Sequence, residues 1–126
     1  MDIGMLKNNH DFYDGYEGEG EVTLRLQSNK EYELHIWEGY FEDIFGKPIF
    51  NQEGWKGFTR DYQESLGVFE DSGEHIITDT QEYPTDLEQY KEKSFSYEET
   101  KSCLQILIEF FVYAQSISSS INVELN

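Results

Sequence analysis

The feature that most restricts the fold is the run TKSCLQILIEFFVYAQS at residues 100–116, which contains neither glycine nor proline. Between positions 103 and 112 eight residues are apolar, whereas Lys101, Gln105 and Glu109 lie four positions apart and form one narrow polar stripe. A helix that is apolar around most of its circumference has to be packed on more than one side. We therefore expect a long helix at the centre of the fold.

The start of this helix is predicted from the four preceding residues, Ser96-Tyr97-Glu98-Glu99. They match a capping box, in which the Ser96 hydroxyl accepts a hydrogen bond from the Glu99 amide and the Glu99 side chain reaches back. The carboxylates of Glu98 and Glu99 also suit the positive end of the helix dipole. The sequence therefore predicts a helix that is capped by Ser96.

Two segments alternate between apolar and polar residues with a period of two, which is typical of strands with one buried face. The segments are EVTLRLQ and EYELHIW, and the residues of the expected buried face are Val22, Leu24, Leu26, Tyr32, Leu34 and Ile36. Ser28-Asn29-Lys30 between the segments suits a short turn. We expect an antiparallel hairpin over residues 20–38, whose other face carries Arg25, Glu33, His35 and Trp37.

Three shorter elements are predicted as well. EHIITDT indicates a strand from His75 to Thr78, and Pro84 suits the start of a short helix over residues 85–91. After the long helix the alternation returns and predicts a final strand, with Ile121, Val123 and Leu125 on one face.

The expected fold class is α+β, in a single domain that spans residues 1–126. An antiparallel sheet starts with the N-terminal β-hairpin, packs on the long C-terminal helix and receives a short final strand. For residues 40–75 helix and strand are both compatible with the sequence, because glycines weaken either assignment.

The charge of the chain restricts its partners. There are 26 acidic residues and 9 basic ones, which gives a net charge of −17. Such a charge repels phosphate backbones and anionic membranes and favours fast encounter with basic proteins. The alternative is that the acidity only keeps the protein soluble or reflects a salt-adapted host. The sequence has no signal-peptide pattern and no apolar run of about 18 residues, so we expect a soluble, cytoplasmic protein.

No motif of a known catalytic or metal site occurs in the sequence. GxSxG, P-loop and HExxH patterns are absent, and the three histidines have no metal-ligand spacing. An EF-hand loop with Gly15 at its sixth position would place His10 and Phe12 where ligands are required. The single cysteine, Cys103, suits a small buried hydrophobic residue. We therefore predict no catalytic residue, metal site or cofactor.

Aromatic rings and carboxylates alternate in two stretches, DFYDGYEGEGE at residues 11–21 and WEGYFED at residues 37–43. Aromatic anchors ringed by charged groups are typical of protein interfaces. The hairpin would bring the two stretches side by side. The predicted partner-binding residues are Tyr13, Asp14, Tyr16, Glu17, Glu19, Trp37, Glu38, Tyr40, Glu42 and Asp43. A third candidate is formed by Trp55, Tyr62 and the acids near them. The alternative is that the rings fill a second small core.

The C-terminal third of the chain resembles immunity proteins of bacterial polymorphic and contact-dependent growth inhibition toxin systems. The resemblance covers about the last 45 residues and is carried by Tyr83-Pro84-Thr85-Asp86-Leu87 with Tyr90, by Phe95-Ser96-Tyr97-Glu98-Glu99-Thr100 and by Asn122-Val123-Glu124. It implies a non-enzymatic protein that binds a cognate toxin domain, often a basic nuclease. No binding residue of such families can be transferred position by position, because the interface varies most.

The leading hypothesis is therefore an inhibitor that neutralises a basic toxin protein, without direct contact to nucleic acid or membrane. Two alternatives remain open. One is a small enzyme that acts on a glycan or another small molecule with a carboxylate pair in an aromatic cleft. The other is a phage- or plasmid-encoded mimic of nucleic acid that inhibits a host enzyme.

Overall fold

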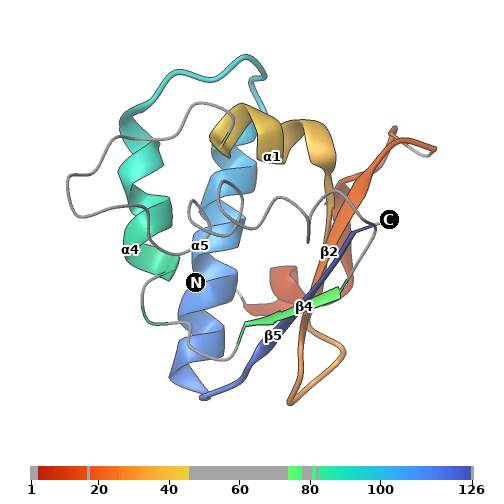
Figure 1. The fold of residues 1–126 in the computed structure, drawn as a ribbon, viewed down its shortest axis with the longest axis vertical. Helices are drawn as coiled ribbons and strands as arrows, with labels where there is room; N and C mark the ends of the chain where they lie inside the picture. Colours follow the sequence, from red (N-terminus) through yellow and green to blue (C-terminus); the bar gives the residue numbers. More distant parts are fainter. Residues whose placement is uncertain (1–2, 17, 46–73, 78–80, 82, 126) are drawn as a thin grey trace.

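The computed structural model describes residues 3–16, 18–45, 74–77, 81 and 83–125. Within these ranges the strands form one five-stranded sheet in the order β1-β3-β2-β5-β4 (Figure 1). The strands are β1 (Asn9–Phe12), β2 (Glu21–Leu26), β3 (Glu33–Trp37), β4 (Glu74–Ile77) and β5 (Ile121–Leu125). The helices are α1 (Glu38–Phe45), α4 (Tyr83–Glu88) and α5 (Thr100–Ser116), with short 3₁₀ turns at η1 (Ile3–Leu6) and η2 (Gln89–Glu92).

The hairpin predicted over residues 20–38 is formed by β2 and β3. Leu24 lies opposite Leu34 in β3 and opposite Val123 in β5, so β2 runs antiparallel to both neighbours. The alternating aliphatic side chains of the three strands are buried on the same face. This agreement follows from the period of two, because a shift of one residue would turn every apolar side chain of a strand to the other face.

The sheet does not begin with the hairpin, and in this respect the predicted fold needs correction. β1 precedes the hairpin and pairs in parallel with β3, so the sheet is mixed and not purely antiparallel. The sequence of β1 is NHDF, which shows no alternation of apolar residues. A four-residue edge strand with such a sequence gives no periodic signal, and its pairing partner lies more than 20 residues further along the chain.

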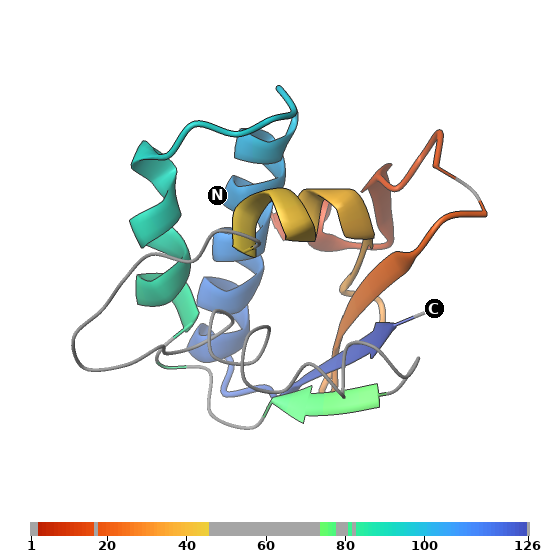
Figure 2. The same cartoon turned by 45° about the horizontal axis from the view of Figure 1, so that its top comes forward.

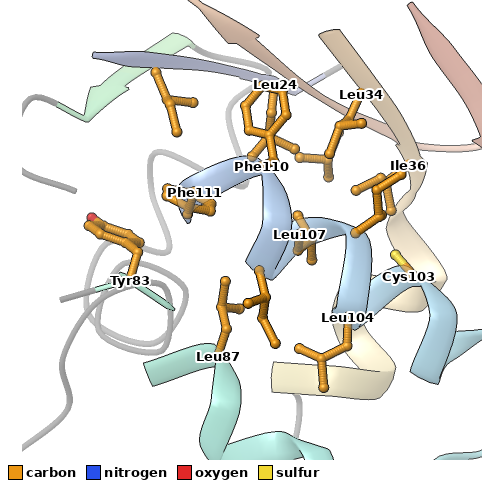
Figure 3. Close-up of a cluster of buried hydrophobic side chains, with 14 of the residues drawn as sticks. Leu24, Leu34, Ile36, Tyr83, Leu87, Cys103, Leu104, Leu107, Phe110 and Phe111 are labelled. Carbon is orange, nitrogen blue, oxygen red and sulfur yellow. The ribbon is translucent and has the colours of Figure 1, made fainter. Parts of the chain in front are cut away.

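Helix α5 is the centre of the fold, as the apolar run predicts. It lies between the sheet and α4 in both views, and α1 crosses over it (Figures 1 and 2). Phe110 and Leu107 extend toward the strands, whereas Phe111 stacks on Tyr83 of α4 with ring centroids 4.9 Å apart (Figure 3). Burial of a large apolar side chain contributes about 1.5–3 kcal/mol, so packing of this helix dominates the stability of the fold.

The predicted capping box is wrong. Helix α5 begins at Thr100, and its N-cap residue Glu99 has helical backbone angles and makes no side-chain cap hydrogen bond. The amides of Ser96 and Tyr97 donate instead to the carboxylate of Asp43 in α1. In a capping box the Ser96 amide would donate to the Glu99 side chain, but Asp43 is already held in place by α1 and accepts from this amide instead.

The shorter elements agree with the sequence to within a few residues. The strand expected from His75 is β4, and Thr78 lies outside the described residues. The short helix after Pro84 is α4, which continues as η2, and the final strand is β5. The third aromatic candidate, around Trp55 and Tyr62, lies outside the described residues. In the part of the chain that the structure describes, the helices are too short or too polar to cross a membrane.

Candidate functional site

The two acidic–aromatic stretches meet at a stacked pair of rings. Tyr16 lies on Trp37 with ring centroids 4.1 Å apart and an angle of 5° between the planes. Trp37 is the last residue of β3 and pairs with Glu21 of β2, while Tyr16 belongs to the turn that precedes β2. The hairpin thus brings the stretches together, as the sequence predicts. A stacked aromatic pair stabilises a structure by about 0.5–1.5 kcal/mol more than the burial of its apolar area alone.

The turn that carries Tyr16 is held by its own hydrogen bonds. The amide of Tyr16 donates to the carbonyl oxygen of Tyr13 at 3.0 Å, and the hydroxyl of Tyr13 donates to the carbonyl oxygen of Glu19 at 2.8 Å. Gly15 and Gly18 adopt φ angles of +94° and +95°, which only glycine reaches without strain. The glycines of this stretch therefore shape a turn, which extends from the end of the sheet at which α1 begins (Figure 2).

Tyr40 does not lie on the surface, which corrects one of the predicted anchors. Its side chain is only 4% exposed, and its ring meets Trp37 edge to face at 5.2 Å. Its hydroxyl lies 3.4 Å from that of Tyr16, and burial raises the pKa of Tyr40 well above its usual range. Tyr40 is therefore buried, as the alternative expected, but it belongs to the main hydrophobic core and not to a second small one, and Tyr16 and Trp37 pack against that core.

Tyr97 belongs to the same cluster, although the sequence indicated only a role at the helix start. Its ring lies 5.1 Å from that of Trp37 at an angle of 68°, and its side chain is 42% exposed. Tyr97 comes from the loop before α5, far from Trp37 in the sequence. No periodic pattern links the two residues, so only the tertiary structure reveals the contact.

Asp43 organises this part of the surface. One of its carboxylate oxygens accepts from the Ser96 amide at 2.9 Å. The other accepts from the Tyr97 amide at 3.0 Å and from the Thr100 hydroxyl at 2.6 Å. Burial alone would raise the pKa of Asp43, but the hydrogen bonds from Thr100 and the two amides outweigh it and lower the pKa. Asp43 stays ionised, and its oxygens point toward the protein itself and not toward a partner.

A hollow of about 400 Å³ opens beside the ring cluster. It is lined by Trp37, Gly39, Glu42, Asp43, Lys93, Ser94, Ser96 and Tyr97. A side chain at Gly39 would overlap with the indole of Trp37, so the close approach of α1 to the ring requires glycine there. Chemically, the hollow offers aromatic walls, hydroxyls and two carboxylates. Because the oxygens of Asp43 already accept hydrogen bonds and its pKa is lowered, this group is suited to electrostatic attraction more than to proton donation.

The other predicted acids surround the cluster. Asp14 and Glu19 are exposed in the turn around Tyr16, and Glu38 and Glu42 are exposed on α1. Glu38 and Glu42 are four residues apart and therefore share one face of that helix. The amide of Glu38 donates to the carbonyl oxygen of Gly20 at 2.9 Å, which ties the start of α1 to the end of the turn. Glu17 lies outside the described residues.

The polar face of the hairpin carries a network of charged side chains that contact one another. Arg25 donates from Nε to Glu33 at 2.5 Å and contacts Glu124 at 3.2 Å, and the ring nitrogens of His35 face Glu21 and Glu33. Burial would raise the pKa of Glu33, but hydrogen bonds from Arg25 and His35 outweigh it and lower the pKa.

His10 stacks on His35 with ring centroids 3.9 Å apart, a proximity that the sequence spacing does not reveal. Within the described residues, however, His, Cys, Asp and Glu side chains nowhere gather in threes that could hold a metal ion.

Comparison of the chain with protein-family models, with curated proteins and with solved structures finds no match. A function therefore has to be inferred from the residues and their arrangement.

Proposed function

We propose that the protein is an immunity protein that binds and neutralises a cognate toxin domain, a basic nuclease. Its binding site is the acidic–aromatic surface, which comprises Tyr13, Asp14, Tyr16, Glu19, Trp37, Glu38, Glu42 and Tyr97. The observation that carries the proposal is the stack of Tyr16 on Trp37, because it unites two separate acidic stretches around one ring cluster.

Within the residues that the structure describes, no cation forms an ion pair with the carboxylates of this surface. The described ion pairs of the chain involve Lys7, Arg25, His35 and Lys91, and none of them includes Asp14, Glu19, Glu38 or Glu42. These carboxylates add to the field of a chain with a net charge of −17. A nuclease has to attract phosphate, so its cleft is basic, and a surface lined by carboxylates can occupy that cleft. Long-range attraction of this kind accelerates association.

The rings supply contact area that is already in place. Tyr16 and Trp37 are partly exposed, and the buried ring of Tyr40 and the turn hydrogen bonds fix their positions. Side chains that are ordered before binding lose little conformational entropy when a partner arrives. Tyrosine and tryptophan in such settings are the residues most often found at interface hot spots.

The experiment is co-expression with the protein encoded next to this one, followed by measurement of the binding kinetics of the purified pair. Growth should be rescued, and higher salt should slow association more than it accelerates dissociation. Trp37→Ala should weaken the complex by more than about 1 kcal/mol. Val112→Ala, which changes an exposed apolar residue of α5, is the matched control and should leave affinity unchanged. An association rate independent of ionic strength would refute electrostatic steering.

The enzyme alternative draws on the same hollow, because Glu42 and Asp43 both line it. A hydrolytic pair needs one protonated carboxyl and one ionised carboxylate that faces the substrate, whereas both oxygens of Asp43 already accept hydrogen bonds from the protein itself. The arrangement therefore favours a binding role. A nucleic-acid mimic would use the acidic–aromatic surface in the same way, and inhibition of a host enzyme in place of the neighbouring toxin would identify it.

A further inference from the structure

We infer that the hollow beside Trp37 receives an arginine side chain of the partner, whose guanidinium lies against Tyr97 and pairs with Glu42. This inference rests on the proposed function and names the chemistry of its central contact. An exposed ring, a carboxylate without a partner among the described residues and two serines lie together around this hollow.

The carboxylate of Glu42 is available for a ligand. Glu42 is exposed, and its side chain has neither a hydrogen bond nor an ion pair among the described residues. Asp43 adds negative charge at the same place, and its hydrogen bonds keep it ionised. The hollow therefore combines a fixed negative charge with one that can turn toward a cation.

The walls of the hollow suit a planar cation with an apolar stem. Trp37 and Tyr97 both line it, and Tyr97 is the more exposed of the two rings. A guanidinium stacks on an aromatic face and donates in pairs to a carboxylate, whereas an ammonium is a compact, strongly hydrated charge. The hydroxyls of Ser94 and Ser96 line the hollow and can accept the remaining N–H groups. A volume of about 400 Å³ lies near the lower end for ligand sites, which suits a single side chain.

Lys93 is the one basic residue among those that line the hollow. Its ammonium lies 5.2 Å from the centroid of the Tyr90 ring, so it is directed toward that ring. Lys93 still opposes a cation in the hollow, whereas it would attract an anion. Removal of its charge therefore distinguishes a cationic occupant from an anionic one.

The test is titration with L-argininamide, observed by NMR at the indole N–H of Trp37. The chain has two tryptophans, and Trp55→Phe assigns the two indole signals. We expect a saturable shift with argininamide and none with citrullinamide, its neutral isostere. Glu42→Gln should weaken binding about twofold to fivefold, and Lys93→Met should strengthen it to a similar extent. Glu98→Gln removes an exposed charge that does not line the hollow and should have a smaller effect than Glu42→Gln.

Besides the absence of argininamide binding, three results would overturn the inference: equal shifts with citrullinamide, equal effects of the Glu42 and Glu98 variants, or weaker binding by the Lys93 variant. An unchanged amide spectrum shows that each variant is folded. If argininamide does not bind although the neighbouring toxin is neutralised and the Trp37 variant fails, the inference is wrong and the proposed function stands. If argininamide binds but no basic toxin is neutralised, the proposed function is wrong.

Discussion

Replacement of Asp43 should destabilise the fold more than replacement of any other acid around the ring cluster. Its carboxylate joins α1 to the loop before α5 through the amides of Ser96 and Tyr97 and the hydroxyl of Thr100. In Asp43→Ala all three donors lose their acceptor. Asp43→Asn keeps one oxygen but turns an amide group toward the other donors.

The expected loss of unfolding free energy depends on how exposed each of the three donors is. The Ser96 and Tyr97 amides are exposed and can bind water, so each loss costs about 0.5 kcal/mol. Thr100 is fully buried, and its unsatisfied hydroxyl costs about 1–3 kcal/mol. We therefore expect Asp43→Ala to lower the free energy of unfolding by about 2–4 kcal/mol and Asp43→Asn by about half of that. For a domain with about 5–15 kcal/mol of stability this is a large effect.

The assay is urea unfolding followed by far-UV circular dichroism between pH 7 and pH 2. The pKa of Asp43 in the folded state lies below its ordinary value of 3.8, so its contribution is complete above that value. As the pH falls through the folded-state pKa, the carboxyl becomes protonated and the contribution is lost. The difference between the wild type and Asp43→Asn should therefore be constant from pH 7 to pH 5 and shrink below about pH 3.8.

The control is Glu42→Ala, because this neighbouring acid is exposed and has no partner among the described residues. It should change stability by less than about 0.5 kcal/mol. An Asp43→Ala variant as stable as this control would refute the structural role of Asp43. A difference between the wild type and Asp43→Asn that persists unchanged to pH 2 would refute its electrostatic origin.

Three further results are expected. Gly39→Ala should force the indole of Trp37 away from its place and weaken partner binding at least fivefold in calorimetry while the fold persists; unchanged affinity would contradict the role of the pre-positioned ring. Phe110→Ala should lower the free energy of unfolding by about 3–5 kcal/mol, since this ring is fully buried, and a loss below about 1 kcal/mol in thermal denaturation would be inconsistent with its central packing. Arg25→Met should destabilise the hairpin by about 1–3 kcal/mol at pH 7. Because the pKa of Glu33 is lowered in the folded state, this loss should become smaller as the pH falls below 4.5, the ordinary pKa of a glutamate. Chemical denaturation at pH 7 and below that value measures the loss, and a loss of equal size at both would contradict the role of the ion pair.

The elements that could be predicted from the sequence are those whose buried residues form a local periodic or continuous apolar pattern. The hairpin follows from a period of two and α5 from a long apolar run, and both are found where the pattern places them. The capping box does not form, because Asp43, which lies more than 50 residues earlier in the chain, accepts from the Ser96 amide that the Glu99 side chain would otherwise bind. Strand β1 was missed because its edge position requires no apolar alternation.

In the candidate site, too, some contacts follow from a local sequence pattern and others depend on residues that are far apart in the chain. The meeting of the two stretches could be predicted, because the hairpin register sets Glu21 opposite Trp37. The burial of Tyr40 had a signal that a helical reading of residues 38–45 would have used, since Tyr40 and Ile44 are four residues apart and both buried. The contact of Tyr97 with Trp37 had no such signal, because it depends on how Asp43 holds the loop before α5.

The most direct test of the central claim is hydrogen–deuterium exchange of the protein alone and in complex with the neighbouring toxin domain. If the stack of Tyr16 on Trp37 is the centre of the interface, binding should slow exchange in residues 11–21 and 37–43 and leave residues 83–92 of α4 and η2 unchanged. Protection confined to residues 83–92, or a complex that protects neither stretch, would contradict the claim.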